Sequence, residues 1–237
     1  DIDPGSVKVE HMFPMRSLDK ATADEEINHF VNETALGATR FLSQPKLDGS
    51  ALSLEYRKGR LVRAATRGSG ERGEDVTRNA RKVGNVPERL NVEVDVHVRG
   101  EVVMQRDIFD FKYSDISPNP RNLAAGALRQ KRAEGKAKPS DLVFQAYDAK
   151  FPALNDRHPD ATEPPNTEFD SEILDWLSEV AGICPAPWKT HQAETPSEVT
   201  QLMIQTTEHW TGIRGQHPFE IDGVVFKVDS LATRVLL

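Results

Sequence analysis

Hydrophobic and polar residues alternate most clearly between residues 91 and 104. Because successive side chains of a strand point to opposite faces, this pattern predicts a strand with one apolar and one charged face. The apolar face carries Val92, Val94, Val96, Val98 and Val102, and the other face carries Glu93, Asp95, His97, Arg99 and Glu101. Apolar runs at 51–56 and 60–65, separated by Lys58-Gly59, predict a β-hairpin. Two more strands are predicted over residues 142–147 and 219–228.

Helices are predicted where a capping residue precedes an apolar stripe. A capping box at Thr22-Ala23-Asp24-Glu25 opens the first helix, which Gly37 ends. Asn119-Pro120 caps a helix of small residues over 121–129. Further helices are predicted over 74–83, over 171–181 before Gly182, and after Thr195. Strands and helices do not follow a regular βαβ order, so we expect an α+β fold with largely antiparallel sheets.

The charge balance narrows the class of partner. The 237 residues include 30 Lys and Arg and 37 Asp and Glu, which gives a net charge of −7. This excludes a uniformly basic nucleic-acid binder but allows a basic groove on an acidic body. Basic residues cluster at 63–82 and 121–138 with acidic neighbours, which fits either phosphate binding or a salt-bridged surface.

Cysteine and apolar content indicate the cellular setting. Cys184 is the only cysteine, which excludes an intramolecular disulfide and a multi-cysteine zinc site, so we expect no zinc in this chain. No apolar run approaches the roughly 20 residues that cross a bilayer, and residues 1–10 show no signal-peptide pattern. We expect a soluble, cytoplasmic protein without membrane contact.

Three local patterns could carry chemistry. Lys46 precedes Leu-Asp-Gly and is either a nucleophile beside a carboxylate or a surface lysine before a turn. Glu101 lies on the charged face of the valine-rich strand, which lines either a cleft or solvent. Asp222 and Lys227 interrupt an apolar strand, which indicates either a site or an edge strand with a lysine reaching for water.

The order of the motifs resembles the adenylation domain of bacterial NAD-dependent DNA ligases over almost the whole chain. The NPRNLAAGALRQ block distinguishes that family from other covalent nucleotidyltransferases, which share KxDG. The matching segments are His11–Met15 with Ser17–Asp19, Lys46–Gly49, Ala65–Gly70, Gly73–Thr77, Val98–Val102, Asn119–Gln130 and Glu220–Val228.

The resemblance implies a two-subdomain covalent nucleotidyltransferase fold with antiparallel sheets around a nucleotide cleft. It implies that Lys46 attacks the α-phosphate of NAD, releases nicotinamide mononucleotide and carries AMP to the 5′-phosphate of nicked DNA, in replication and repair. Residues at cofactor-binding positions are Ser17, Leu18, Gln44, Asp48, Arg67, Glu101, Asp222 and Lys227, and those for the later DNA steps are Arg121 and Arg129. Mg²⁺ is expected near Asp48, Glu101 and Asp222.

Two positions depart from the family pattern: Gln44 stands where the family usually has Glu, and Ser69 where it usually has Asp. We expect residues 1–237 to be the adenylation domain of a longer ligase, acting as a monomer, without the N-terminal nicotinamide-binding module and the C-terminal OB, zinc-finger, helix-hairpin-helix and BRCT parts. Two alternatives remain. The first is another covalent nucleotidyltransferase, either an ATP-dependent polynucleotide or RNA ligase or a capping guanylyltransferase. The second is a nucleotide-binding domain with impaired catalysis.

Overall fold

Two larger antiparallel sheets organise the chain, which the computed structural model describes over residues 7–34, 38–131 and 136–235. The four-stranded sheet has the order β4 (Arg60–Thr66), β3 (Ser50–Arg57), β6 (Val96–Met104) and β7 (Leu142–Lys150). The three-stranded sheet has the order β8 (Lys189–Gln192), β2 (Arg40–Leu47) and β9 (Ile221–Val228), and a small sheet pairs β1 (Lys8–Glu10) with β5 (Arg72–Glu74). Every pairing is antiparallel, which confirms the predicted α+β class.

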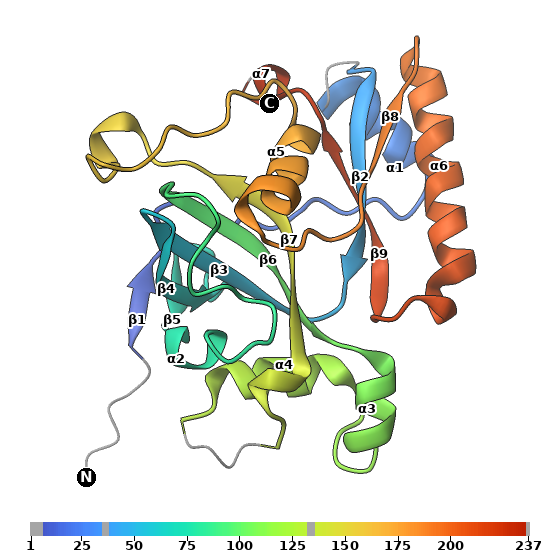
Figure 1. The fold of residues 1–237 in the computed structure, drawn as a ribbon. Coiled ribbons are helices and arrows are strands. Elements are labelled where there is room, and N and C mark those ends of the chain that lie inside the picture. Colours follow the sequence, from blue (N-terminus) through green and yellow to red (C-terminus); the bar gives the residue numbers. More distant parts are fainter. Residues whose placement is uncertain (1–6, 35–37, 132–135, 236–237) are drawn as a thin grey trace.

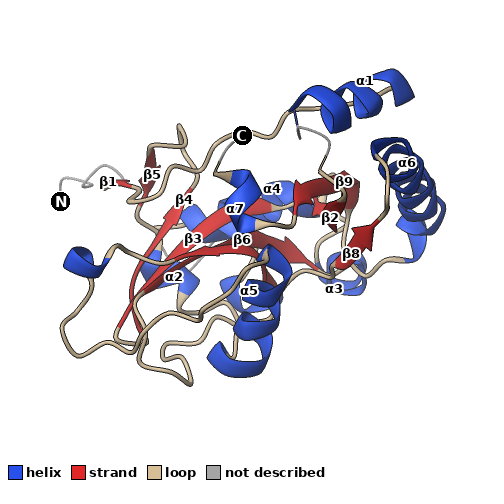
Figure 2. Cartoon of the chain, turned by 90° about the horizontal axis from the view of Figure 1, so that it is seen from above, coloured by secondary structure: helices blue, strands red, loops and turns tan. Residues whose placement is uncertain are grey.

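Helices cover one face of each larger sheet (Figures 1 and 2). The four-stranded sheet packs against α2 (Thr77–Ala80), α4 (Pro120–Arg129) and α5 (Asp170–Trp176), which continues as a π-helical turn over Leu177–Ala181. The three-stranded sheet packs against α6 (Pro196–Ile213) and α1 (Asp24–His29), which continues over Phe30–Thr34. The remaining helices are α3 (Arg106–Lys112), α7 (Leu231–Arg234) and 3₁₀ turns at Pro139–Asp141, Leu154–Asp156 and Arg214–Gln216. No described helix is long and apolar enough to cross a membrane.

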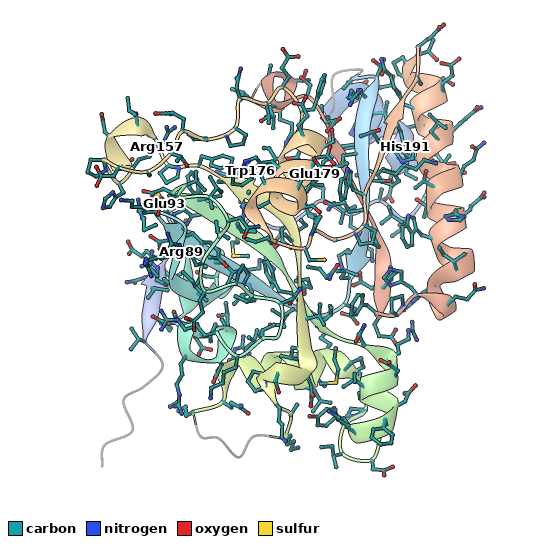
Figure 3. The ribbon with its side chains drawn as sticks, in the orientation of Figure 1. Arg89, Glu93, Arg157, Trp176, Glu179 and His191 are labelled. Atoms are coloured by element: carbon teal, nitrogen blue, oxygen red, sulfur yellow. The ribbon has the colours of Figure 1, made fainter. Side chains whose placement is uncertain are left out.

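The alternating valines of β6 form part of the core of the four-stranded sheet. Val96, Val98 and Val102 are fully buried and pack with residues of β3, β7, α4 and α5 in one large cluster. On α5, the Trp176 ring packs edge-on against Phe151, with the ring centroids 5.4 Å apart (Figure 3). On the opposite face of the sheet, β6 carries the polar side chains of His97, Arg99 and Glu101.

Several element boundaries lie where turn and capping residues in the sequence predict them. Lys58 and Gly59 both have positive φ, of 47° and 70°, as a two-residue hairpin turn requires. The Asn119 side chain accepts a hydrogen bond from the backbone N–H of Asn122 at 2.9 Å and begins α4 as predicted. Gly182 ends the α5 segment with a φ of 80°.

Three expected boundaries differ in the structure. The first helix begins at Asp24, and Glu26 rather than Glu25 accepts from the backbone N–H of Ala23 at 3.1 Å. Gly37, its predicted end, lies outside the described residues. The segment 74–83 forms only the short α2, because Arg72–Glu74 pairs with β1 instead. The valine-rich strand starts at Val96, and Val92 and Val94 precede it.

Candidate active site

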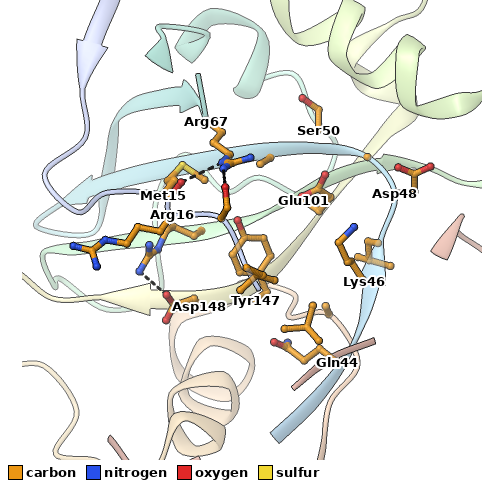
Figure 4. Close-up of a pocket in the computed structure, with 18 of the residues that line it drawn as sticks. Met15, Arg16, Gln44, Lys46, Asp48, Ser50, Arg67, Glu101, Tyr147 and Asp148 are labelled. Atoms are coloured by element: carbon orange, nitrogen blue, oxygen red, sulfur yellow. Dashed lines mark hydrogen bonds and ion pairs between the residues drawn. The ribbon is translucent and has the colours of Figure 1, made fainter. Parts of the chain in front are cut away.

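A cavity of about 1090 Å³ lies over the polar face of the four-stranded sheet, between that sheet and strands β2 and β9 (Figure 4). The segment 14–18, α4 and Arg234 of α7 complete its wall. Among the described residues its lining carries nine cationic side chains and three acidic ones, although the chain as a whole has a net charge of −7. The basic groove on an acidic body that the charge balance allows is therefore present. We call this cavity the cleft.

Lys46 lies near the end of β2, where the strand turns into β3 at Asp48-Gly49. Its register partner on β9 is Gly223, so the lysine stem meets no side chain opposite it. The Lys46 Nζ donates to both carboxylate oxygens of Asp222 at 2.6 Å, and the lysine side chain is 48% exposed. Lys46 also lines the cleft, as the nucleophile hypothesis requires.

A second group of charges lies beside Lys46. Arg121, near the start of α4, pairs with Asp48 through Nη1 and Oδ1 at 2.7 Å. Glu101, in the middle of β6, also lines the cleft, so the solvated alternative for this strand face is wrong there. Burial raises the pKa of Glu101 to about 7, against the opposing charges of Arg121 and Lys46 and a hydrogen bond from the Gly49 backbone.

Arginines hold the segment 14–18 over the sheet. The Arg67 guanidinium donates to the Ser17 hydroxyl at 2.6 Å and to the Met15 carbonyl at 3.1 Å (Figure 4). Arg99 donates to the Pro14 carbonyl at 3.0 Å and pairs with Asp148. Ser17 and Leu18 thereby line the cleft, Leu18 with an exposed side chain. Arg67 and Arg99 thus fix this segment as a wall of the cleft.

Gln44 and Tyr147 both line the cleft. Gln44 is 2% exposed, and its Nε2 has no hydrogen-bond partner in the described part of the chain. The Tyr147 ring lies among Gln44, Lys46 and Glu101 (Figure 4). Tyr147 was not among the residues expected from the sequence. The alternation along the predicted 142–147 strand places it on the polar face, so this pattern could have identified it. An aromatic face beside an unpartnered amide suits a planar heterocycle with hydrogen-bonding edges.

Lys227 also reaches the cleft, from the edge strand β9. Its Nζ contacts a buried carboxylate oxygen of Asp170 at 2.5 Å and donates to the Tyr147 carbonyl at 2.8 Å. Only 14% of the lysine side chain is exposed, so β9 is an edge strand, but its lysine does not extend into water. Asp170 and Arg234 are the other residues of this group that the sequence analysis missed.

The basic clusters separate into two kinds. Arg67, Arg121 and Arg129 line the cleft, and Arg129 also pairs with Glu74 at 2.9 Å. Arg63 instead pairs with Glu55 at 2.6 Å, outside the cleft.

All the site residues expected from the sequence line the cleft except Asp222, which contacts it through Lys46. Ser69 lies in the turn beside the cleft, where its hydroxyl accepts from the Arg72 backbone at 3.2 Å.

The comparison with known protein families agrees with this geometry. Residues 5–237 match the family model described as the NAD-dependent DNA ligase adenylation domain. The chain belongs to this family. It is 34% identical to a DNA ligase of Bacillus licheniformis over 233 residues, which are 94% of this chain and 32% of that protein. It is also 34% identical to a DNA ligase of Bacillus cereus strain AH820 over 236 residues, 95% of this chain and 33% of that protein.

As a member of this family, the chain spans about a third of the length of the curated ligases it matches. The ATP-dependent DNA ligase of bacteriophage T7 in complex with ATP overlaps 92% of this chain and 63% of its own, at 15% identity and a TM-score of 0.42. The identity and the TM-score are both low, so this structure does not bear on the function of the chain. The family match favours the NAD-dependent interpretation over the ATP-dependent alternative.

The carboxylates expected near Mg²⁺ are paired with protein cations or largely buried in the described structure. Asp48 is paired with Arg121 and Asp222 with Lys46, while Glu101 has a pKa raised by burial. Within the described residues, no group of three or more His, Cys, Asp or Glu side chains comes together to hold an ion.

Proposed function

We propose that this chain transfers AMP from NAD to its own Lys46, the first step of DNA ligation. The Lys46 amine attacks the α-phosphorus, an N–P bond forms, and the P–O bond to nicotinamide mononucleotide breaks. The product is lysyl-AMP, a phosphoramidate. The observation that carries this proposal is the position of Lys46 in a cationic cleft that also offers an aromatic ring and a free amide.

The lining of the cleft suits the adenosine half of the substrate. The Tyr147 ring offers a face on which adenine can stack, and the buried amide of Gln44 can pair with an edge of the base. The Glu101 carboxylate and Arg67 guanidinium can bind the ribose hydroxyls, with the Ser17 hydroxyl beside Arg67. Leu18 adds apolar surface at the adenine side.

The charges around Lys46 support the transfer step. Lys227, Arg121 and the other cations of the cleft are already in place and offset the negative charge that develops on the phosphate. The Lys46 ammonium must lose a proton and turn from Asp222 before its lone pair reaches phosphorus. The Asp222 carboxylate is the nearest group placed to accept that proton, at 2.6 Å. Asp48 is held by Arg121 beside the nucleophile.

Exposed arginines at the rim of the cleft support the later steps. Arg121 and Arg129 have side chains that are 58% and 53% exposed, so phosphates of nicked duplex DNA can reach them. In the proposed sequence, AMP moves from Lys46 to the 5′-phosphate of the nick, and the 3′-hydroxyl then displaces AMP. Such a chain would act as the adenylation domain of a longer, cytoplasmic ligase that works as a monomer in replication and repair.

Mass spectrometry of the intact protein tests the first step. The protein is stripped of bound nucleotide, incubated with NAD, ATP or GTP, and digested to locate any added AMP. We expect one AMP on Lys46 with NAD alone. Each incubation is run with and without Mg²⁺, because Asp48 and Asp222 are engaged with cations. An adduct formed from ATP instead, or on another residue, would contradict the proposal.

A further inference from the structure

Asp170 is a buried carboxylate between two cations at the edge of the cleft. It is the first residue of α5 and only 1% exposed. Its Oδ2 lies 2.5 Å from Lys227 Nζ on β9, and its Oδ1 lies 2.8 Å from Arg234 Nη1 on α7. Both cations line the cleft, whereas Asp170 does not. The carboxylate therefore contacts the cleft only through these two partners.

The Asp170 side chain is not what anchors α5. The backbone N–H of Asp170 donates to the Asp229 carbonyl at 2.8 Å, and Ser171 donates to the Asp229 carboxylate through its backbone and hydroxyl at 2.8 and 3.0 Å. Arg40 pairs with the same carboxylate at 2.8 Å. These contacts join α5 to the end of β9 without the Asp170 carboxylate, so its charge can be removed while the junction stays.

Lys227 crosses from one sheet to the other. It belongs to the three-stranded sheet, while the Tyr147 carbonyl that it contacts belongs to the four-stranded sheet. A lysine ammonium has three N–H donors, and the Tyr147 carbonyl accepts from one of them, which leaves donors for a ligand in the cleft. A mostly buried charge is costly without a counter-charge beside it, and Asp170 is placed to supply one to Lys227.

The balance of charges at Asp170 agrees with this arrangement. Burial acts to raise the pKa of the Asp170 carboxyl, but Lys227 and Arg234 outweigh it, so the net shift is downward. Asp170 is therefore an anion at neutral pH.

We propose that Asp170 is a positioning residue, which holds the Lys227 ammonium directed at the phosphate of the bound nucleotide. The inference rests on the proposed function for the identity of that nucleotide. It assigns a role to a residue outside every motif that links the chain to its family.

Two explanations predict opposite changes in AMP affinity for Asp170→Asn. If Asp170 acts only as a negative charge near the phosphate, its removal strengthens attraction for AMP. If it positions Lys227, its removal weakens AMP binding, and adenosine, which has no phosphate, binds as before. We expect calorimetry to show AMP affinity at least fivefold lower and adenosine affinity within twofold of the unmodified protein. Asp175→Asn, an exposed change on the same helix, serves as the matched control.

A double variant that combines Asp170→Asn with Lys227→Met tests whether Asp170 acts through Lys227. We expect it to bind AMP no more weakly than Lys227→Met alone, because the two residues act as a unit. AMP affinity that is unchanged or higher in Asp170→Asn, or losses that multiply in the double variant, would overturn the proposal. If Asp170→Asn does not fold, Asp170→Ser is measured in the same way.

The rate of AMP transfer to Lys46 separates this inference from the proposed function. In single-turnover reactions with NAD, we expect Asp170→Asn to be at least tenfold slower and Asp175→Asn to match the unmodified protein. If the unmodified protein forms no lysyl-AMP, the proposed function fails, and the AMP and adenosine affinities still decide the role of Asp170. If it forms lysyl-AMP and Asp170→Asn is equally fast, only the inference about Asp170 fails.

Discussion

The proposed nucleophile depends on one property of a lysine amine, its capacity to lose a proton. In Lys46→Arg the guanidinium keeps the charge and can still pair with Asp222, but it stays protonated at any accessible pH and cannot attack phosphorus. We therefore expect no AMP adduct in this variant and unchanged thermal unfolding. Mass spectrometry of the intact protein after incubation with NAD measures the adduct. An AMP adduct at full yield in Lys46→Arg would place the nucleophile elsewhere.

Gln44 is the residue where this chain departs from its family beside the proposed base. Because the Gln44 amide nitrogen has no partner in the described chain, a carboxylate at the same position gives up no internal hydrogen bond through that atom. A carboxylate can accept from the amino group of adenine, so we expect Gln44→Glu to keep or improve AMP affinity in calorimetry. A loss of about 2 kcal/mol or more would instead show that the amide N–H donates to the base.

Glu101 makes stability depend on pH. Burial raises the pKa of its carboxyl from 4.5 to about 7 in the folded protein. Between these values the folded state holds a proton that the unfolded state has released, so the free energy of unfolding falls as the pH rises. The full effect is about 3 kcal/mol, from roughly 1.4 kcal/mol for each pKa unit.

Urea unfolding at several pH values measures this contribution. We expect Glu101→Gln to remove the part of the decline in stability that lies between pH 4.5 and 7. A variant whose stability falls as steeply as that of the unmodified protein would show that other groups cause the decline.

At the scale of elements, replacing a glycine by alanine is expected to change the free energy of unfolding in opposite directions at two positions. Gly182 ends the α5 segment at a φ of 80°, and a Cβ there would lie 2.7 Å from the Asn91 amide. Gly182→Ala is expected to lower the free energy of unfolding by about 1–2 kcal/mol. Gly126 lies inside α4 with nothing within 4 Å of an added Cβ, so Gly126→Ala is expected to raise it by about 0.5–1 kcal/mol. Chemical denaturation measures both, and equal signs would contradict the account.

At the scale of the whole molecule, charge is distributed unevenly. The cationic cleft lies in a protein with a net charge of −7, so attraction for an anion is local and sensitive to salt. We expect AMP to bind several-fold more weakly in 0.5 M than in 0.05 M NaCl, while adenosine affinity stays the same. Calorimetry at both concentrations measures this. An equal loss for both ligands would show that salt acts on the fold and not on the phosphate.

The sequence by itself determined the features whose causes are local. The Lys58-Gly59 turn, the Asn119 cap and the alternation along β6 each depend on a few neighbouring residues, and all three are present in the structure. The ordered motifs likewise contain the residues predicted for the site, and all of these except Asp222 line the cleft.

Only the tertiary structure decided the features that depend on distant contacts. Lys46 and Asp222 are 176 residues apart, and their contact exists because β2 pairs with β9. The raised pKa of Glu101 depends on what buries it, and the role proposed for Asp170 depends on α5, β9 and α7 meeting at one point. Burial and cross-sheet pairing arise from packing between segments, which local composition does not encode.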